Sequence, residues 1–499
     1  MEKGRDHNEN PQVAENHSHC PPPTTINIWR QERWGLNHHG LTGHNLDPLM
    51  ILPSIGSKEA DAITFFEFVS IENLNHYQPS QSWRNMMMFF SQTVPSVRHA
   101  ALALALLHRD FTDRGSPSSL HPPQSFGDYP PGHLPLVHYN RAIELLLDHD
   151  TGDNPERTAI TLLVCYLLTC FDHLAGNYVQ AIKHLRGGVD ISCKMNNSIL
   201  DKEDPDYDAT HSSVSTVINQ VTRQIRRLDL QAVTFLVDWI PTDTHDTIMS
   251  QSSPSDDVFQ TLDQAADCLQ ILVNEVLRLH NTGQQFNGTS EMSASLFISR
   301  PIVLRQLEVW LNRFQNMVPR DTSHENDTDT GRLISLLRLK YGVAWIHLSS
   351  FGPGKEMEYD SFLTDFQQCA SLADGIATAH ERHPGSLKPT FTPEIGIVPM
   401  LYLIAVKCRH PVVRRQALGT LRRHPIREAV WDSICVARVV ERVIDIEESG
   451  SQQAEQIALG QRIETLSWIH VENLPNPPRV DITYVFCGRG ETHTESLKI

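Results

Sequence analysis

The residues that could do chemistry near the N-terminus are His17, His19 and Cys20. Imidazole and thiolate side chains of this kind bind zinc. A structural zinc site needs four ligands at fixed spacing, and the next three histidines, between residues 38 and 44, do not complete such a pattern. We therefore interpret this segment as a histidine-rich tail and not as a metal site.

The motifs of common enzymes are missing from the sequence. The segment His380-Glu381-Arg382-His383 has the wrong spacing to place two zinc ligands on one helical face. The run from Gly352 to Lys355 lacks the spacing of a phosphate-binding loop, and the acidic segment 321–331 lacks the glycine and final glutamate of a calcium loop. No dinucleotide fingerprint, nucleophile elbow or kinase signature occurs. The sequence predicts no catalytic, cofactor-binding or metal-ligating residue, and therefore no enzyme.

Two groups of charged residues allow a functional interpretation. Lys407, Arg409, Arg414, Arg415, Arg422, Arg423 and Arg427 are seven cations with no acidic residue between them. They could contact phosphate or an acidic partner, but a solvated helical face is the favoured interpretation, and no aromatic residues alternate with them as single-strand binding would require. Asp229, beside Arg226 and Arg227, could pair inside the fold, but we favour a solvated charge cluster of little energetic value.

Composition limits the class of protein. The chain has 499 residues, 40% hydrophobic and 20% charged residues, and a formal net charge of −17, which argues against non-specific nucleic-acid binding. Its nine cysteines are scattered and show no CxxC spacing, so we expect reduced and mostly buried thiols in an intracellular protein. No secretory signal is present, and the longest apolar runs fall short of the about 20 residues of a membrane span, so no membrane helix is expected.

Apolar periodicity predicts helices along most of the chain. Strong examples are Pro95–Phe111, Glu156–His173 and Asn177–Cys193, the last two joined through Gly176, which suits a left-handed helix cap. This pair is of the tetratricopeptide kind. We expect Met195–His211 to be a loop, and Met86, Met87 and Met88 to fill a core.

The stretch Gly396–Glu448 is expected to form a helical hairpin. Pro411 fits the first turn of one helix, and His424-Pro425 ends it, because the residue before a proline avoids helical geometry. A second helix follows, for which we predict these inward positions: Val430, Trp431, Ile434, Val440 and Ile444. Arg414, Arg415 and Arg422 are expected to lie off the buried face of the first helix.

The whole chain is predicted to be all-α, a large antiparallel helical array with tetratricopeptide-like helix pairs and a small C-terminal β-hairpin. The hairpin is expected from the alternating segments Ile463–Asn473 and Val480–Cys487. The predicted domains are a disordered or loosely packed arm (1–57), a helical body (58–450), and the hairpin with its tail (451–499).

Several phrases of the sequence resemble one family. GIVPMLYLIAVKC, KCRHPVVRRQAL and HPIREAVWDS lie between residues 396 and 433, and three further phrases precede them in order: AGNYVQAIKHLRGGVDI (175–191), RRLDLQAVTF (226–235) and EMEYDSFLTDFQQCASLADGI (356–376). Together with the region 65–111, they are similar to the regulatory region of the fungal-specific transcription factors. The resemblance covers roughly residues 60–490, and its phrases are packing motifs that name no ligand.

The resemblance implies a nuclear transcription regulator that controls metabolic or biosynthetic genes. Members of this family usually begin with a six-cysteine, two-zinc DNA-binding cluster, whereas the first sixty residues here hold only Cys20. No zinc ligand can therefore be assigned, and this chain is not expected to bind a specific DNA sequence through a zinc cluster. It would act through protein partners, which are co-regulators or a separate DNA-binding subunit; a homodimer is left open. The alternative is a helical scaffold that binds a protein or small molecule and has no transcriptional role.

Overall fold

The structure is a computed structural model that describes residues 57–114, 134–147, 154–200, 209–236, 239, 241, 258–285, 290–318, 329–350, 355–381, 388–449, 457–471 and 479–499. The chain divides into two compact units, residues 1–50 and 51–499, and every element below belongs to the second unit. Residues 1–56 of the predicted arm, with His17, His19 and Cys20, lie outside the described residues. The predicted domain boundaries at residues 57 and 450 stay predictions.

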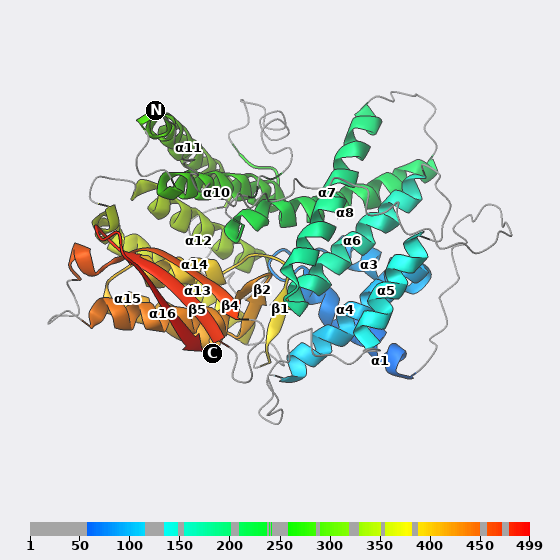
Figure 1. The fold of residues 1–499 in the computed structure, drawn as a ribbon. Coiled ribbons are helices and arrows are strands. Elements are labelled where there is room, and N and C mark those ends of the chain that lie inside the picture. Colours follow the sequence, from blue (N-terminus) through cyan, green and yellow to red (C-terminus); the bar gives the residue numbers. More distant parts are fainter. Residues whose placement is uncertain are drawn as a thin grey trace, which may run out of the picture. The chain divides into compact units, whose positions relative to one another are not determined.

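Helices make up most of the described residues, which confirms the predicted all-α class (Figure 1). Those before residue 235 are α1 (Ser57–Phe65), the π-helical η2 (Phe66–Ser70), α2 (Ile71–Leu74), α3 (Gln81–Thr93), α4 (Pro95–Arg114), α5 (Leu134–Leu147), α6 (Pro155–Ala175), α7 (Tyr178–Leu200), α8 (Ala209–Gln231) and the 3₁₀ turn η4 (Ala232–Thr234). Their apolar side chains share one core, in which Met86 and Met87 are buried as predicted.

The pair α6–α7 has the predicted tetratricopeptide-like turn. Asn154 caps the start of α6, with its side-chain oxygen accepting a hydrogen bond from the backbone N–H of Glu156. Gly176 ends α6 with a φ of 78°, in the left-handed region that glycine adopts without strain. The chain therefore reverses at Gly176, and α7 packs back against α6.

Helix α6 is the most apolar long helix of the described residues. By length and composition alone it could cross a membrane, since its most apolar window has a mean hydropathy of 1.6. However, 78% of that window is buried inside the protein, where its side chains pack against α4, α7 and α8. This is the environment of a core helix.

The later helices form a second array, with two core clusters of its own. They are α10 (Leu262–Gln285), α11 (Ser290–Met317), α12 (Asp329–Ser349), the 3₁₀ helix η5 (Lys355–Phe362), α13 (Leu363–Glu381), α14 (Val398–Lys407), α15 (Pro411–Arg423) and α16 (Ser433–Glu448). Residues 195–200 belong to α7 and residues 209–211 to α8, so the prediction of a loop throughout Met195–His211 is wrong at both ends.

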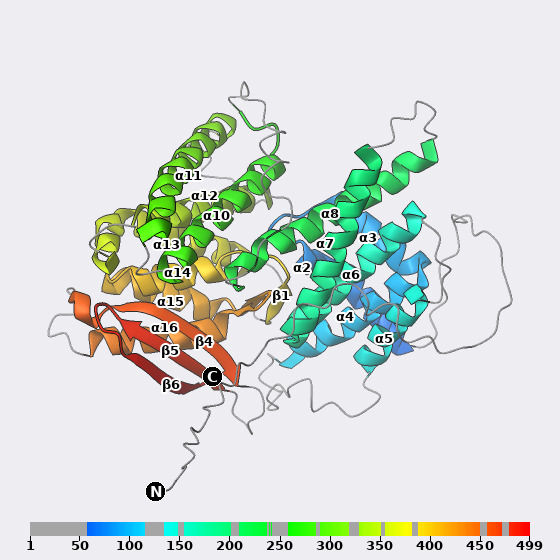
Figure 2. The same ribbon diagram turned by 45° about the horizontal axis from the view of Figure 1, so that its top comes forward.

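The predicted C-terminal hairpin is confirmed, and a third strand extends it. Strands β4 (Ile463–Val471), β5 (Arg479–Phe486) and β6 (Thr492–Lys498) form an antiparallel sheet in that order, preceded by the 3₁₀ turn η6 (Leu459–Gln461) (Figure 2). One face of β5 is apolar and packs into the core that it shares with α16, while Arg442 of α16 pairs with Glu495 of β6 at 2.7 Å. The sheet is therefore attached along its length and does not stand alone.

The structure of Gly396–Glu448 differs from the predicted helical hairpin in the segment between α15 and α16. Pro411 starts α15 and His424-Pro425 ends it, as predicted. The chain then forms β2 (Ile426–Glu428), which pairs in parallel with β1 (Thr390–Thr392) and antiparallel with β3 (Trp431–Asp432).

A tight turn separates β2 from β3, and Ala429 has a φ of 50° in it. Helix α16 begins only at Ser433, because the Asp432 carboxylate caps it by accepting the N–H groups of Ile434 and Cys435. The prediction that Val430 and Trp431 belong to this helix is wrong. Ile434 is exposed and not inward, whereas Val440 and Ile444 are buried as predicted.

Candidate functional site

The seven cations of the basic stretch all have partners in the fold. Arg415 pairs with Glu448, Arg422 with Glu441, and Arg423 with Asp374 and Glu381. Arg427 donates to the Leu174 carbonyl and the Tyr178 hydroxyl. Lys407, Arg409 and Arg414 are buried, so the interpretation as a solvated face is wrong for these three, and Arg414 is not off the buried face. A phosphate site gains no support, because each charge already has a partner.

The buried members form a continuous chain of ion pairs. Glu356 accepts from Lys407 at 2.6 Å and from Arg409 at 2.7 Å. Arg409 continues to Glu447 at 3.0 Å, and Glu447 accepts from Arg414 at 2.7 Å. The side chains of Glu447 and Arg414 are 0% exposed, so each charge depends on its partner for the solvation that water would otherwise supply.

The two carboxylates stay ionised in this network. Burial alone would raise the pKa of Glu356, but Lys407 and Arg409 outweigh it and the pKa is lowered. Burial would likewise raise the pKa of Glu447, but Arg409 and Arg414 lower it below its usual value. Mutual compensation of buried charges is the physical cause in both cases.

The same network attaches the C-terminal sheet to the helices. The N–H of Ile463, the first residue of β4, donates to Glu447 at 2.9 Å, and Arg409 donates to the Ile463 carbonyl. The neighbouring Arg462 donates to the Glu356 carbonyl and to both oxygens of Asp360. Residues of η5, α15, α16 and β4 are thus joined by charge as well as by apolar packing.

A second buried carboxylate joins β2 to the start of α14. Glu428 accepts the backbone N–H groups of Gly396, Ile397 and Val398 at 2.8–3.2 Å, and the Tyr77 hydroxyl at 2.5 Å. Burial raises the pKa of Glu428 to about 7, although these donors oppose the shift. A Cβ on Gly396 would lie 2.0 Å from the Tyr77 ring, so glycine is required for this close approach.

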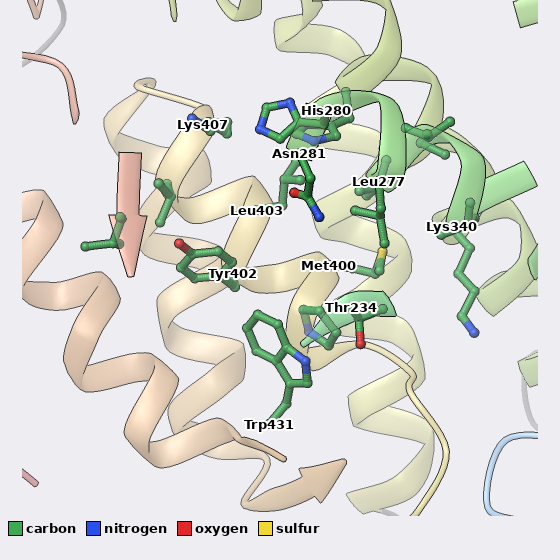
Figure 3. A pocket seen from close by; sticks show the side chains of 18 of the residues that line it. Thr234, Leu277, His280, Asn281, Lys340, Met400, Tyr402, Leu403, Lys407 and Trp431 are labelled. Atoms are coloured by element: carbon green, nitrogen blue, oxygen red, sulfur yellow. The ribbon is translucent and has the colours of Figure 1, made fainter. Parts of the chain in front are cut away.

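The main candidate site is a cavity of about 270 Å³ between several of these elements (Figure 3). Its walls come from η4, α10, α12, α14, β3 and β4. The residues that line it are Thr234, Val273, Val276, Leu277, His280, Asn281, Lys340, Val343, Ala344, His347, Pro399, Met400, Tyr402, Leu403, Val406, Lys407, Trp431, Ile463, Glu464, Leu466 and Trp468. We call this the α14 cavity.

Aromatic rings form one wall of the α14 cavity. Tyr402, Trp431 and Trp468 contact one another with ring centroids 5.2–5.6 Å apart. Two of the contacts are edge-to-face, which fixes the rings in a rigid apolar surface. Trp431 reaches this wall because the β2–β3 turn places it beside the cavity and not on a helix.

The imidazoles at the α14 cavity are uncharged at neutral pH. His280 and His347 lie with ring centroids 4.0 Å apart. Burial, with Lys407 adding to it, lowers the pKa of His280 to about 3, and burial also lowers the pKa of His347. His347 is further held by a 3.0 Å hydrogen bond between its Nδ1 and the Tyr359 hydroxyl.

The two lysines that line the α14 cavity have electrostatic partners. Lys407 pairs with Glu356, as described above. Burial lowers the pKa of Lys340 to about 8, while the nearby carboxylates of Glu394 and Glu428 favour its charged form. Figure 3 shows Lys340 and Lys407 on opposite sides of the view, with the apolar residues between them.

Buried thiols among the described residues are not activated for catalysis. Burial raises the pKa of the Cys165 and Cys369 thiols to about 12, so neither is an activated nucleophile. The described cysteines are free, and most are buried, as predicted. Within the same residues no group of three or more histidine, cysteine or acidic side chains is placed to hold a metal ion.

Sequence patterns did not predict the burial of Asp229 or the residues of the α14 cavity. Asp229 is buried and accepts a 2.9 Å hydrogen bond from the Trp239 indole, so its interpretation as solvated is wrong. Arg227 is buried too, and pairs with Asp267 at 3.2 Å. The residues that line the cavity were not predicted as a site, because six separate elements supply them and no spacing along the chain marks them.

Comparison with known proteins shows a distant similarity to a fungal transcription regulator. The chain is 21% identical over 424 residues to the aspercryptin biosynthesis cluster-specific transcription regulator atnN of Emericella nidulans, covering 68% of this chain. The match covers 65% of that regulator, so the chain spans just under two thirds of its length. No family model matches the sequence, and no solved structure matches it. The chain is thus similar to a transcription regulator of a biosynthesis cluster.

Proposed function

We propose that this chain is the regulatory and effector region of a fungal-type transcription regulator that controls genes of secondary metabolism. The observation that carries the proposal is the similarity to a cluster-specific transcription regulator over 424 residues. The phrases that resemble the fungal-specific transcription factors agree with it.

The structure supports this proposal through the places that the phrases occupy. RRLDLQAVTF forms the end of α8 with η4, GIVPMLYLIAVKC forms α14, and KCRHPVVRRQAL forms α15 with the residues before it. These segments supply Glu428's backbone donors, the buried Arg409 and Arg414, and a wall of the α14 cavity. These segments are therefore parts of the packed body of the protein.

The proposed regulator acts in the nucleus through protein partners. Only Cys20 lies in the first sixty residues of this sequence, so the six-cysteine zinc cluster of the resembled family is not encoded there. We therefore assign no DNA contact to the residues of this sequence and propose that they contact protein partners, such as a co-regulator or a DNA-binding subunit. The acidic net charge of −17 fits contact with proteins better than direct contact with phosphates.

A tethering assay tests the proposal. The full chain is fused to a foreign DNA-binding domain and placed above a reporter gene, with the DNA-binding domain alone as the control. Reporter output is expected to rise or fall relative to that control at equal protein levels. Unchanged output, with the fusion shown to be nuclear, would contradict the proposal.

The α14 cavity favours a second candidate function, a helical scaffold that binds a small molecule or protein and has no transcriptional role. Cavities with apolar walls and a few polar groups are typical ligand sites. The two candidates differ in location. A tagged chain that is excluded from the nucleus would favour the scaffold, whereas nuclear accumulation together with reporter activity would exclude it.

A further inference from the structure

We propose that the α14 cavity binds an uncharged, flat and mainly apolar ligand of about two fused rings, which exchanges hydrogen bonds with the carboxamide of Asn281. The binding step follows from the cavity and is independent of the transcriptional role. Its regulatory consequence, described below, rests on the proposed function.

The volume of the cavity sets the size of the ligand. An apolar cavity of about 150 Å³ accommodates benzene. The α14 cavity, at about 270 Å³, is close to twice as large, so two fused rings fit within it. The rigid wall of Tyr402, Trp431 and Trp468 favours a flat ligand, because a planar ring system can pack against it at offset or edge-to-face distances.

Asn281 provides the polar contact inside the cavity. It lies on α10 next to His280, is half-buried, and its carboxamide has no hydrogen-bond partner in the part of the chain that the structure describes. Figure 3 shows the carboxamide pointing between Leu277 and Leu403 toward Met400. A carboxamide offers both a donor and an acceptor, so a ketone, amide or phenol on the ligand would satisfy it.

The charges around the cavity argue against an ionised ligand. Lys407 is neutralised by Glu356, Lys340 faces the carboxylates of Glu394 and Glu428, and the two histidines are uncharged. Glu464, which also lines the cavity, has an interaction of its own and is not a free counter-charge. An ion moved from water into this space would therefore lose solvation without gaining a free counter-charge.

A bound ligand would contact the C-terminal sheet directly. Ile463, Leu466 and Trp468 of β4 line the cavity opposite side chains of α10 and α14. A ligand that fills the space would add apolar contacts to β4 and reduce its opening. The regulatory consequence is that ligand binding stabilises the position of the β4–β5–β6 sheet on the helices.

The test uses the purified full chain and the dye prodan, an uncharged two-ring naphthalene with one ketone. Prodan is expected to bind once per chain at dye concentrations below about 1 mM and to shift its emission to the blue. The competitor naphthalene-2-sulfonate, which has the same two fused rings and a fixed negative charge, is expected to bind at least about tenfold more weakly. Equal or tighter binding of the sulfonate would overturn the proposal of an uncharged ligand.

Two variants locate the bound dye. Asn281→Leu keeps the approximate size of the side chain and removes its hydrogen bonds, so prodan affinity is expected to fall about three- to tenfold. Asn85→Leu makes the same change on the exposed surface of α3 and is expected to have no effect. Leu403→Trp fills the cavity and is expected to abolish binding, with circular dichroism confirming the helical fold. Unchanged affinity in Leu403→Trp or Asn281→Leu would refute the assignment, as would the absence of prodan binding to the unmodified chain.

Hydrogen exchange tests the consequence for the sheet. Saturating prodan is expected to slow exchange of the β4 amides and to leave those of α5 unchanged. Faster or unchanged exchange in β4 would refute the regulatory step. These outcomes can be distinguished from those of the tethering assay. Dye binding together with an inactive fusion would contradict only the proposed function. An active fusion without dye binding would contradict only the proposal of a ligand in the α14 cavity.

Discussion

Removing the charge of Glu447 is expected to destabilise the attachment of the C-terminal sheet. Glu447→Gln keeps the shape of the side chain, but it leaves the guanidinium groups of Arg409 and Arg414 to share the charge of Glu356 and the part-exposed Glu448. Glu447 and Arg414 are 0% exposed, so water cannot replace the lost charge. Breaking a buried ion pair by removing one partner costs about 3–5 kcal/mol, and we expect a cost in this range.

The neighbouring Glu448 provides a matched control. Its carboxylate is 16% exposed and pairs with Arg415, which is 50% exposed, and at 3.6 Å with the buried Arg414. Exposed pairs contribute about 0–1 kcal/mol, and Arg414 keeps its 2.7 Å partner Glu447 in this variant, so Glu448→Gln is expected to cost less than Glu447→Gln. The double variant Arg414→Met/Glu447→Met removes one buried charge of each sign and is expected to be more stable than Glu447→Gln.

Hydrogen exchange of β4 and urea unfolding measure the effect. The N–H of Ile463 donates to Glu447, so local opening of β4 should report the loss first. A cost of about 3–5 kcal/mol corresponds to an increase of about two to three and a half powers of ten in the exchange rate of protected β4 amides. If Glu447→Gln and Glu448→Gln lower stability equally, the reasoning that burial amplifies this charge is wrong.

Three further predictions concern the turns and the second buried carboxylate. Gly396→Ala places a Cβ 2.0 Å from the Tyr77 ring and should destabilise by at least about 1–3 kcal/mol in urea unfolding, whereas Gly419→Ala, with open space around its Cβ in α15, should be neutral or stabilising. Gly176→Ala, at a φ of 78°, should cost about 1 kcal/mol and lower the melting temperature. Burial raises the pKa of Glu428 from 4.5 to about 7, so its contribution is complete below pH 4.5 and is lost as the pH rises through 7. Glu428→Gln should therefore flatten the stability profile between these pH values, and an unchanged slope would contradict the assignment.

The ends of helices were predicted correctly where one residue acts on the backbone next to it. Pro411, Gly176 and His424-Pro425 act on the backbone within one turn of their own position, so their effects could be derived from neighbouring residues. The β2–β3 hairpin was missed for the opposite reason. Its strands are short, and β2 is held by pairing with β1, more than thirty residues earlier, through register partners such as Phe391 and Arg427.

Charge patterns were harder to interpret than helix patterns. The basic stretch has no acidic residue within it, yet Lys407 and Arg409 are neutralised by Glu356, and Arg414 by Glu447. These carboxylates lie between 33 and 53 residues away in sequence. The burial of these side chains could not be predicted from the sequence either, because a paired arginine can occupy an interior position that an unpaired arginine cannot. A count of like charges along the chain therefore cannot distinguish a binding surface from an internal ion-pair network.

The residues that line the α14 cavity come partly from the family-like phrases and partly from other segments. Thr234, Met400, Tyr402 and Trp431 belong to the phrases through which the sequence resembles fungal transcription factors. The residues that α10, α12 and β4 contribute, including Asn281, lie outside those phrases. The phrases also supply buried charges that hold the fold, such as Arg409 and Arg414, so exchanging those charges should destabilise the protein. Exchanging the α10 and β4 residues should instead alter which molecule fits. We therefore expect the phrases to identify the kind of protein and to supply most of the aromatic wall, and the cavity residues outside them to determine which ligand fits against that wall.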